Sequence, residues 1–288
     1  MLSVHTNYAS LIAQNSVTKS NDMLTNAMER LSTGMRINSA ADDAAGLQIA
    51  TRLNSNVVGM QTASRNVSDA TSMLQTADGA LDEVTTIALR QKELALQAAN
   101  GVNSDADLNA LHAEFNELRT EITRIIGDGT ANNPGTQYAG NDLFGSLDGG
   151  VDFQIGSSST EVLTVTAARI NLAAIDDGTG AGTTVDLATA TLTTSTGAND
   201  AIDVVDALLN EVGTRRSTLG ANINRLGHTA SNLANVTQNT QAAAGRIMDT
   251  DFAVESANMT RNQLLVQAGT NILSSANQNT NLVMGLLR

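Results

Sequence analysis

The sequence predicts a mainly α-helical protein whose N- and C-terminal segments form a long antiparallel helical bundle or coiled coil, with a small β-rich central region between them. Three observations support this fold class. Apolar residues repeat with helical spacing in residues 1–127 and again in 201–288, and about half of the 23 glycines and the single proline lie in between. Aromatic residues are only 2% of the chain, so its core must be mostly aliphatic, which suits helix–helix seams.

The N-terminal part contains a long series of apolar residues that lie seven positions apart. The series is Leu53, Met60, Val67, Leu74, Leu81, Ala88 and Ala95. Such sustained spacing predicts a coiled-coil-like seam. A helix from Asp43 to Ala99 would be about 85 Å long at 1.5 Å per residue. Gly101 is the predicted stop, and Asn103, Ser104 and Asp105 predict the cap of a next helix.

That next helix is predicted up to Gly127 by apolar residues that alternate steps of three and four. They are Leu108, Leu111, Phe115, Leu118, Ile122 and Ile125. A third seam follows in the C-terminal part, at Val205, Leu208, Val212, Leu219, Leu226, Leu233, Val236 and Ile247. Polar residues also occupy this seam, at Arg215, Asn222, Thr229 and Thr240, and such residues lower stability but can fix the register of packed helices.

Residues 249–251 predict a break before a last helix.

The central residues, about 128–200, contain the alternating runs 151–155 and 162–165 and a Thr-rich stretch from Thr183 to Thr194. These patterns predict strands or hairpins on a small lobe, and the alternative is a flexible polar loop.

Charge and composition exclude several classes of protein. The net charge is −13, which disfavours binding to nucleic acid and to anionic membrane surfaces. No apolar run approaches the roughly 18 residues of a membrane span. The N-terminus has no basic region followed by an apolar segment, so no cleavable secretory signal is expected. The absence of cysteine excludes disulfides and thiolate metal sites.

Both ends of the chain are amphipathic but nearly uncharged. Residues 252–288 contain only Glu255, Arg261 and Arg288 as charged side chains. Helices that pack among copies of themselves avoid charge, because unpaired buried charges are costly. We therefore expect both ends to become ordered in an assembly, through Leu11, Leu24, Leu31, Leu265, Ile272, Leu282 and Leu286. The alternative is a pair of disordered tails, which is compatible with folding on assembly.

Several long segments resemble bacterial flagellins, in the order found in that family. In the N-terminal half they are MERLSTGMRINSAADDAAGLQIATRL at 28–53 and KELALQAANG at 92–101. In the C-terminal half they are TLGANINRL at 218–226, RIMDTD at 246–251, MTRNQLLVQAGT at 259–270 and the final LLR. The resemblance covers about 1–145 and 201–288. The sequence departs from the family pattern after Gln278. A proline is common near this point in the family, whereas this chain has Asn279 and Thr280.

The resemblance implies a structural subunit, not an enzyme, that self-polymerises into the extracellular flagellar filament for motility. Removal of residues 157–196 should then leave polymerisation intact. It implies export unfolded through the flagellar type III apparatus. It implies as partners other flagellin copies, the filament cap and hook-junction proteins, and an export chaperone. It also implies five segments: 1–42 and 249–288 as an inner coiled-coil core, 43–145 and 201–248 as a helical-bundle domain, and 146–200 as a short variable surface region.

The family resemblance also suggests two surface sites. Arg90, Glu93, Leu94 and Glu114 match a surface that Toll-like receptor 5 recognises in many flagellins. The family pattern Leu-Gln-Arg is Ala88–Leu89–Arg90 here, and the alternative is that these residues are solvated or contact other subunits. Ser157, Ser158 and Ser159 are candidate acceptors for O-linked glycans, because flagellins are often modified in their exposed region.

Nothing in the sequence points to catalysis, a cofactor or a metal. The three histidines lack ligand-spaced neighbours, and the glycine-rich run at 178–182 lacks the lysine of a phosphate-binding loop. Two alternatives from other classes remain. A hook–filament junction protein has related ends, but the NSAADDAAG and QAGT segments are of the filament type. A flagellin with a grafted metalloprotease would need an H-E-x-x-H motif, which the sequence lacks.

Overall fold

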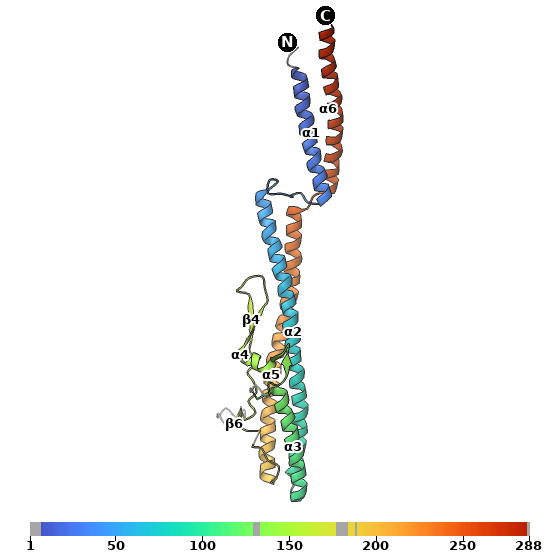
Figure 1. The fold of residues 1–288 in the computed structure, drawn as a ribbon. Coiled ribbons are helices and arrows are strands. Elements are labelled where there is room, and N and C mark those ends of the chain that lie inside the picture. The colour runs from blue at the N-terminus through green and yellow to red at the C-terminus, as the bar shows by residue number, and fades with distance from the viewer. Residues whose placement is uncertain (1–6, 129–132, 177–183, 188, 287–288) are drawn as a thin grey trace. The chain divides into compact units, whose positions relative to one another are not determined.

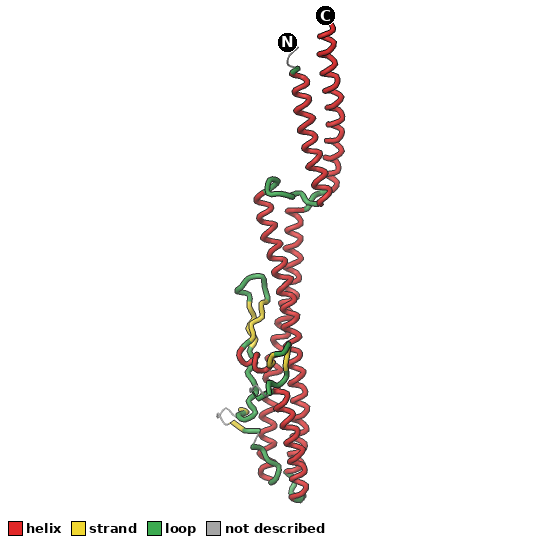
Figure 2. The backbone as a smooth tube through the Cα atoms, viewed as in Figure 1, coloured by secondary structure: helices red, strands yellow, loops and turns green. Residues whose placement is uncertain are grey.

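The structure is a computed structural model that describes residues 7–128, 133–176, 184–187 and 189–286, with the backbone alone at 176, 184–185 and 279–286. Helices make up most of it, and short strands occur only in the central region (Figures 1 and 2). The predicted fold class is confirmed. The described residues group into two compact units, one up to Val57 and from Gln238 onward, the other from Val58 to Thr237.

The first unit contains a pair of antiparallel helices, α1 (Tyr8–Thr33) and α6 (Phe252–Leu286), which lie side by side (Figure 1). Asn7 caps α1 by accepting from the N–H of Ser10, and Gly34 ends it in the left-handed conformation. The less exposed residues of α1 follow steps of three and four: Ala13, Val17, Ser20, Leu24, Ala27 and Leu31. In α6 they are Glu255, Met259, Asn262, Val266, Gly269, Leu273 and Ala276.

Two linkers, residues 34–43 and 249–251, connect this helix pair to the ends of α2 and α5 within the same unit. They pair with antiparallel geometry between Met35 and Asp249. The N–H of Thr250 donates to the carbonyl oxygen of Gly34 at 3.0 Å. The N–H of Arg36 donates to the carbonyl oxygen of Met248 at 2.6 Å. Each linker is therefore held by the other through backbone hydrogen bonds.

Carboxylates shape both linkers. The carboxylate of Asp42 accepts hydrogen bonds from the N–H groups of Asn38 and Ser39 and from the Ser39 hydroxyl. The backbone bonds from Ser39 and Asn38 lower the pKa of Asp42. Asp43 accepts from the N–H of Gly46 at the start of α2, and Asp251 accepts from the first N–H groups of α6. The NSAADD segment therefore encodes a turn and a helix cap.

The second unit contains three long helical segments: most of α2 (Ala44–Ala98), α3 (Asp105–Ile126) and the first part of α5 (Ser195–Met248). The buried side chains are mostly aliphatic, as the composition predicts. Lys92 of α2 pairs with Asp206 of α5 at 2.5 Å, and Arg216 of α5 reaches Asp78 and Asp82 of α2. The predicted cap is confirmed, because Ser104 and Asp107 form a reciprocal capping box at the start of α3.

Where the structure describes it, the central region consists of α4 (Leu143–Gly149) and three two-stranded antiparallel ribbons. The ribbons are β1–β2 (Gln137–Tyr138, Asn141–Asp142), β3–β4 (Val151–Gln154, Val162–Val165) and β5–β6 (Ile175–Asp176, Thr184–Val185). The strands predicted at 151–155 and 162–165 are confirmed as β3 and β4, with Val151 opposite Val165. The Thr-rich stretch was predicted less well: β6 covers only Thr184–Val185, and Thr183 and residue 188 lie outside the described residues.

The central region is also more integrated than a projecting lobe. Leu163, Val165, Ile170, Leu187 and Leu192 are buried, and the amide of Asn66 in α2 donates to the carbonyl oxygen of Gln154. Neither α4 nor the early start of α5 was predicted. Because this segment supplies core residues to the second unit, its removal is expected to destabilise that unit.

Candidate assembly surfaces

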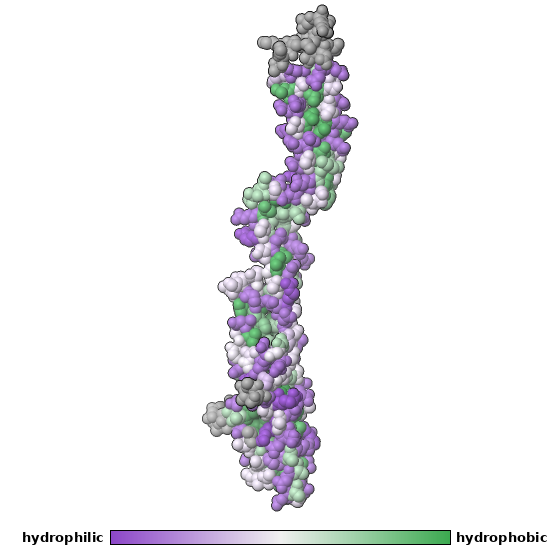
Figure 3. Space-filling model, viewed as in Figure 1, coloured by the Kyte–Doolittle hydropathy of each residue, from purple (hydrophilic) through white to green (hydrophobic). Residues whose placement is uncertain are grey.

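The outer faces of the terminal helices carry large apolar side chains that remain exposed in the part of the chain that the structure describes. On α1 the exposed ones are Tyr8, Leu11, Ile12, Met23 and Met28, and on α6 they are Phe252, Val254, Leu264, Leu265 and Ile272. Figure 3 shows apolar surface along this helix pair. Exposed apolar surface of this extent marks an interaction site in a folded protein.

The residues predicted for the inner core divide between two faces. Leu24 and Leu31 are half-buried at the α1–α6 contact. Leu11, Leu265 and Ile272 lie on outer faces, with exposed fractions of 56%, 47% and 61%. The side chains of Leu282 and Leu286 lie outside the described residues.

Charge is scarce on the outer face of α6. Between Phe252 and Gln278, α6 carries only Glu255 and Arg261, and Glu255 is buried. A solvated helix usually displays many charges, since ionised side chains are strongly hydrated and mostly remain at the surface. The outer face of α6 therefore combines high apolar exposure with low charge, whereas α1 carries Lys19, Asp22, Glu29 and Arg30.

The α1–α6 contact itself is close. A Cβ added to Gly269 would lie 2.5 Å from Cγ2 of Val17, so the two helices approach at a glycine. Nearer the C-terminus, the Asn7 amide donates to the carbonyl oxygen of Ala276 at 2.9 Å. The Ser10 hydroxyl donates to Oδ1 of Asn277 at 3.0 Å. These contacts place defined residues of α1 opposite defined residues of α6.

The structure buries most of the residues predicted for the bundle seam. Those buried are Met60, Val67, Leu74, Leu81, Phe115, Leu219, Leu226 and Leu233, whereas Leu111 and Leu118 are half-buried. Val236, predicted on the same seam, is exposed. The second unit thus has an internal core that does not depend on another copy.

Three of the four residues matched to the receptor surface lie together on the second unit. Arg90 of α2 forms ion pairs with Glu114 of α3 at 2.8 Å and with Glu93 at 3.0 Å. Hydrogen bonds from Arg90 to Glu114 and then to Glu93 raise the pKa of its guanidinium. Leu94 is separate from them, because it is 1% exposed and faces the core. Leu89 and Leu96, which sequence reasoning did not select, are the exposed leucines nearby.

Ser157, Ser158 and Ser159 lie exposed in the turn between β3 and β4. The N–H of Ser158 donates to the Glu161 carboxylate at 2.9 Å, which orders the turn. Ser157 packs closely on α2, because a Cβ added to Gly59 of α2 would lie 2.8 Å from the Cβ of Ser157.

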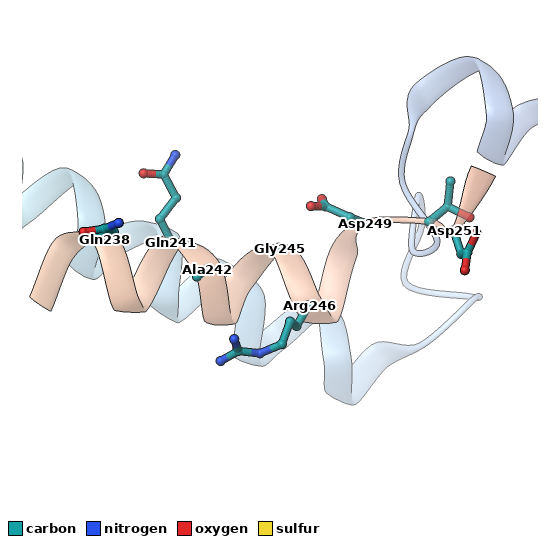
Figure 4. A pocket seen from close by; sticks show the side chains of 8 residues that line it. Gln238, Gln241, Ala242, Gly245, Arg246, Asp249 and Asp251 are labelled. Atoms are coloured by element: carbon teal, nitrogen blue, oxygen red, sulfur yellow. The ribbon is translucent and has the colours of Figure 1, made fainter. Parts of the chain in front are cut away.

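A shallow pocket of about 590 Å³ lies in the first unit, at the end of α5. It is lined by residues that include Gln238, Gln241, Arg246, Asp249 and Asp251. In Figure 4, Gln241 and Asp249 point to one side of α5 and Arg246 points to the other. These polar groups do not converge on a common point, so the pocket is a surface depression and not a site where they could act together.

No helix in the described part of the chain is both long and apolar enough to cross a membrane. Paired terminal helices with apolar outer faces, charge-poor on α6 and joined to a separate helical unit, are the features of a filament-forming subunit. Comparison with known proteins agrees with this class. The family model for the bacterial flagellin N-terminal helical region matches residues 4–144, and that for the C-terminal helical region matches 202–287.

A flagellin of Halalkalibacterium halodurans is 42% identical over 262 residues, which cover 91% of both chains. Flagellin A of Vibrio cholerae is 32% identical over an alignment of 386 positions that covers both chains fully. That alignment is longer than the 288 residues of this chain, so the Vibrio protein carries inserted residues. A solved structure of a putative flagellar hook-associated protein from Vibrio parahaemolyticus covers 72% of this chain and all of its own, with a TM-score of 0.54. At 15% identity, it shares the fold alone.

The chain belongs to the bacterial flagellin family. It is a structural subunit of the extracellular flagellar filament, which serves motility, and it is not an enzyme. The predicted family, function and location are thereby confirmed. Self-assembly follows from the family, whereas the residues and the partners that take part in it are proposals.

Proposed function

We propose that copies of this flagellin polymerise by burying the outer faces of α1 and α6 against the same faces of neighbouring copies. The observation that carries the proposal is the exposure of Leu264, Leu265 and Ile272 on a helix with almost no charge. Water contact with these side chains is unfavourable, and their burial between copies removes it. The second unit has its own core and would add lateral contacts between copies.

This assignment divides the chain by role. Residues 1–42 and 249–288 would form the inner core of the filament, including Leu282 and Leu286. Residues 43–145 and 201–248 would form the surrounding bundle. Residues 146–200 would form the outer surface, where exposure of Ser157, Ser158 and Ser159 supports O-linked modification. The filament is then a mechanical element whose stiffness comes from interlocked helices.

The same apolar faces need protection before assembly. We propose that an export chaperone covers α6, because an exposed apolar helix face fits a groove of complementary shape. We further propose passage through the flagellar type III apparatus as an unfolded chain, which the lack of cysteine suits. Cap and hook-junction proteins would contact the terminal helices at the two ends of the filament.

A second role is recognition by Toll-like receptor 5 through the surface formed by Arg90, Glu93 and Glu114. The exposure of this ion-paired cluster supports the proposal. Leu94 would act only indirectly, because it is buried. A charge reversal at Glu114 should weaken receptor activation by monomeric subunits. Unchanged activation would assign these residues to solvent or to subunit contacts.

Deletion of residues 252–288 tests the assembly role. The truncated chain should stay monomeric when mixed with filament seeds, while circular dichroism reports an intact second unit. The full-length chain under the same conditions is the control. Filaments of normal length from the truncated chain would contradict the proposal.

A further inference from the structure

We infer that Val17 and Gly269 fix the register of α1 against α6, and that assembly depends on this register. The inference rests on the proposed role of the terminal helices in polymerisation. It assigns a positioning role to one small residue and one β-branched residue.

The geometry at Gly269 leaves no room for a side chain. A Cβ there would lie 2.5 Å from Cγ2 of Val17, far inside van der Waals contact. Valine in a helix has one strongly preferred χ1 rotamer, so its methyl group cannot easily turn away. Val17 therefore acts as a knob whose hole is the missing side chain of Gly269.

This hole occurs once in the part of α6 whose side chains are described. Residues 252–278 contain no other glycine. A slip of one heptad would bring Val17 opposite Asn262 or Ala276, and each carries the side chain that Gly269 lacks. A one-heptad slip displaces one helix by about 10 Å, at 1.5 Å per residue. The knob and its hole therefore distinguish one register from the next.

A second set of contacts specifies the same register seven residues further along α6. The Asn7 amide donates to the carbonyl oxygen of Ala276, and the Ser10 hydroxyl donates to Asn277. A slip of one heptad would take the Asn277 side chain away from the Ser10 hydroxyl, whereas the Asn7 amide could donate to another backbone carbonyl oxygen of α6. The close approach at Gly269 and the contact between Ser10 and Asn277 thus favour one alignment.

The register matters because it sets how the outer faces of the two helices align. Leu11 and Ile12 of α1 and Leu264, Leu265 and Ile272 of α6 are exposed on the same helix pair. A neighbouring copy that contacts both helices meets a surface composed of both sets. Displacement by one heptad would present a different surface, one that does not match the neighbour.

The register can be tested by cross-linking, because the chain contains no cysteine. Ser10→Cys and Asn277→Cys place two thiols where two side chains are hydrogen-bonded. Oxidised filaments of this double variant should contain mostly the intramolecular disulfide. Adding Gly269→Ala should reduce the cross-link severely and raise the critical concentration for seeded growth at least about fivefold, through overpacking.

A compensating substitution separates lost register from general damage. Val17→Ala removes the methyl groups that collide with the new Cβ, so Val17→Ala with Gly269→Ala should recover most of the cross-link and of the growth. Gly79→Ala in α2 is the matched control, because a Cβ there meets nothing within 4 Å. That control should assemble normally, since glycine-to-alanine changes in helices are otherwise favourable.

Three results would overturn the inference: no cross-link in filaments of the parent double variant, wild-type growth and cross-linking of Gly269→Ala, or no compensation by Val17→Ala. The proposed function fails by a different result, which is polymerisation of the chain that lacks residues 252–288. The two hypotheses can therefore be rejected separately.

Discussion

Removal of the apolar side chains from the outer face of α6 should raise the critical concentration for filament growth by about two to four orders of magnitude. The perturbation is the triple variant Leu264→Ala, Leu265→Ala and Ile272→Ala. These residues are 60%, 47% and 61% exposed in the single chain. Full burial of a leucine or isoleucine side chain contributes about 1.5–3 kcal/mol.

If neighbouring copies cover the area that remains exposed, about half of that energy at each site becomes available on assembly. The three sites together then contribute about 2.5–5 kcal/mol, and each 1.4 kcal/mol is a factor of ten in an equilibrium constant. The isolated subunit should not be destabilised, because the replaced side chains are exposed and alanine has the highest helix propensity.

The assay is sedimentation of polymer after seeding, over a range of subunit concentrations. The matched control is Gln267→Ala with Asn271→Ala, which alters exposed polar residues of the same helix. The control should lie within a few-fold of wild type. A triple variant with the critical concentration of wild type would refute the reasoning, because the apolar face of α6 would then remain in solvent after assembly.

Three further outcomes are expected in the second unit. Phe115→Ala should destabilise it by about 3–5 kcal/mol in urea denaturation, since Phe115 is fully buried; a loss below 1 kcal/mol would mean that the site is not packed as described. Ser104→Ala should cost about 1 kcal/mol at pH 7 by removal of the cap of α3, and exposed Ser68→Ala, mid-helix in α2, serves as control. Hydrogen bonds from the Ser104 hydroxyl and N–H lower the pKa of Asp107, so its stabilising effect is present above the unfolded-state pKa near 3.9 and is lost as the pH falls through the folded-state value. The difference between wild type and Asp107→Asn should therefore shrink below about pH 4, and a difference that grows on acidification would contradict this.

Much of the helical architecture could be predicted from spacing alone. Heptad leucines such as Leu74, Leu219 and Leu226 are buried, because a seven-residue repeat keeps one face of a helix turned to its partner. Ser104 was predicted as a cap because hydroxyl side chains satisfy the free N–H groups of a helix start. A long apolar repeat is enough to predict a helix from the sequence, and capping residues predict where the helix ends.

Other features depend on contacts that spacing does not encode. Leu94 directly follows the exposed Glu93, yet it is buried, because the 100° step between successive residues of a helix takes its side chain to the inner face of α2. Leu24, Leu31, Leu265 and Ile272 were all predicted to become ordered in an assembly. Leu24 and Leu31 are half-buried at the α1–α6 contact, whereas Leu265 and Ile272 lie on the outer face of the pair. The helical pattern locates apolar positions, and it does not tell which partner covers them. The close approach at Gly269 likewise depends on which residue of α1 lies opposite.

The paired linkers have a mechanical consequence. The chain is a subunit of a filament that serves motility, and such a filament carries mechanical load. Residues 34–43 and 249–251 are irregular segments, and alone each would stretch easily. The N–H groups of Arg36 and Thr250 donate hydrogen bonds to the carbonyl oxygens of Met248 and Gly34. A pull along either linker therefore loads both hydrogen bonds in shear, and the two bonds resist it together. The two linkers consequently share the tension, and this part of the first unit gains rigidity from backbone hydrogen bonds alone.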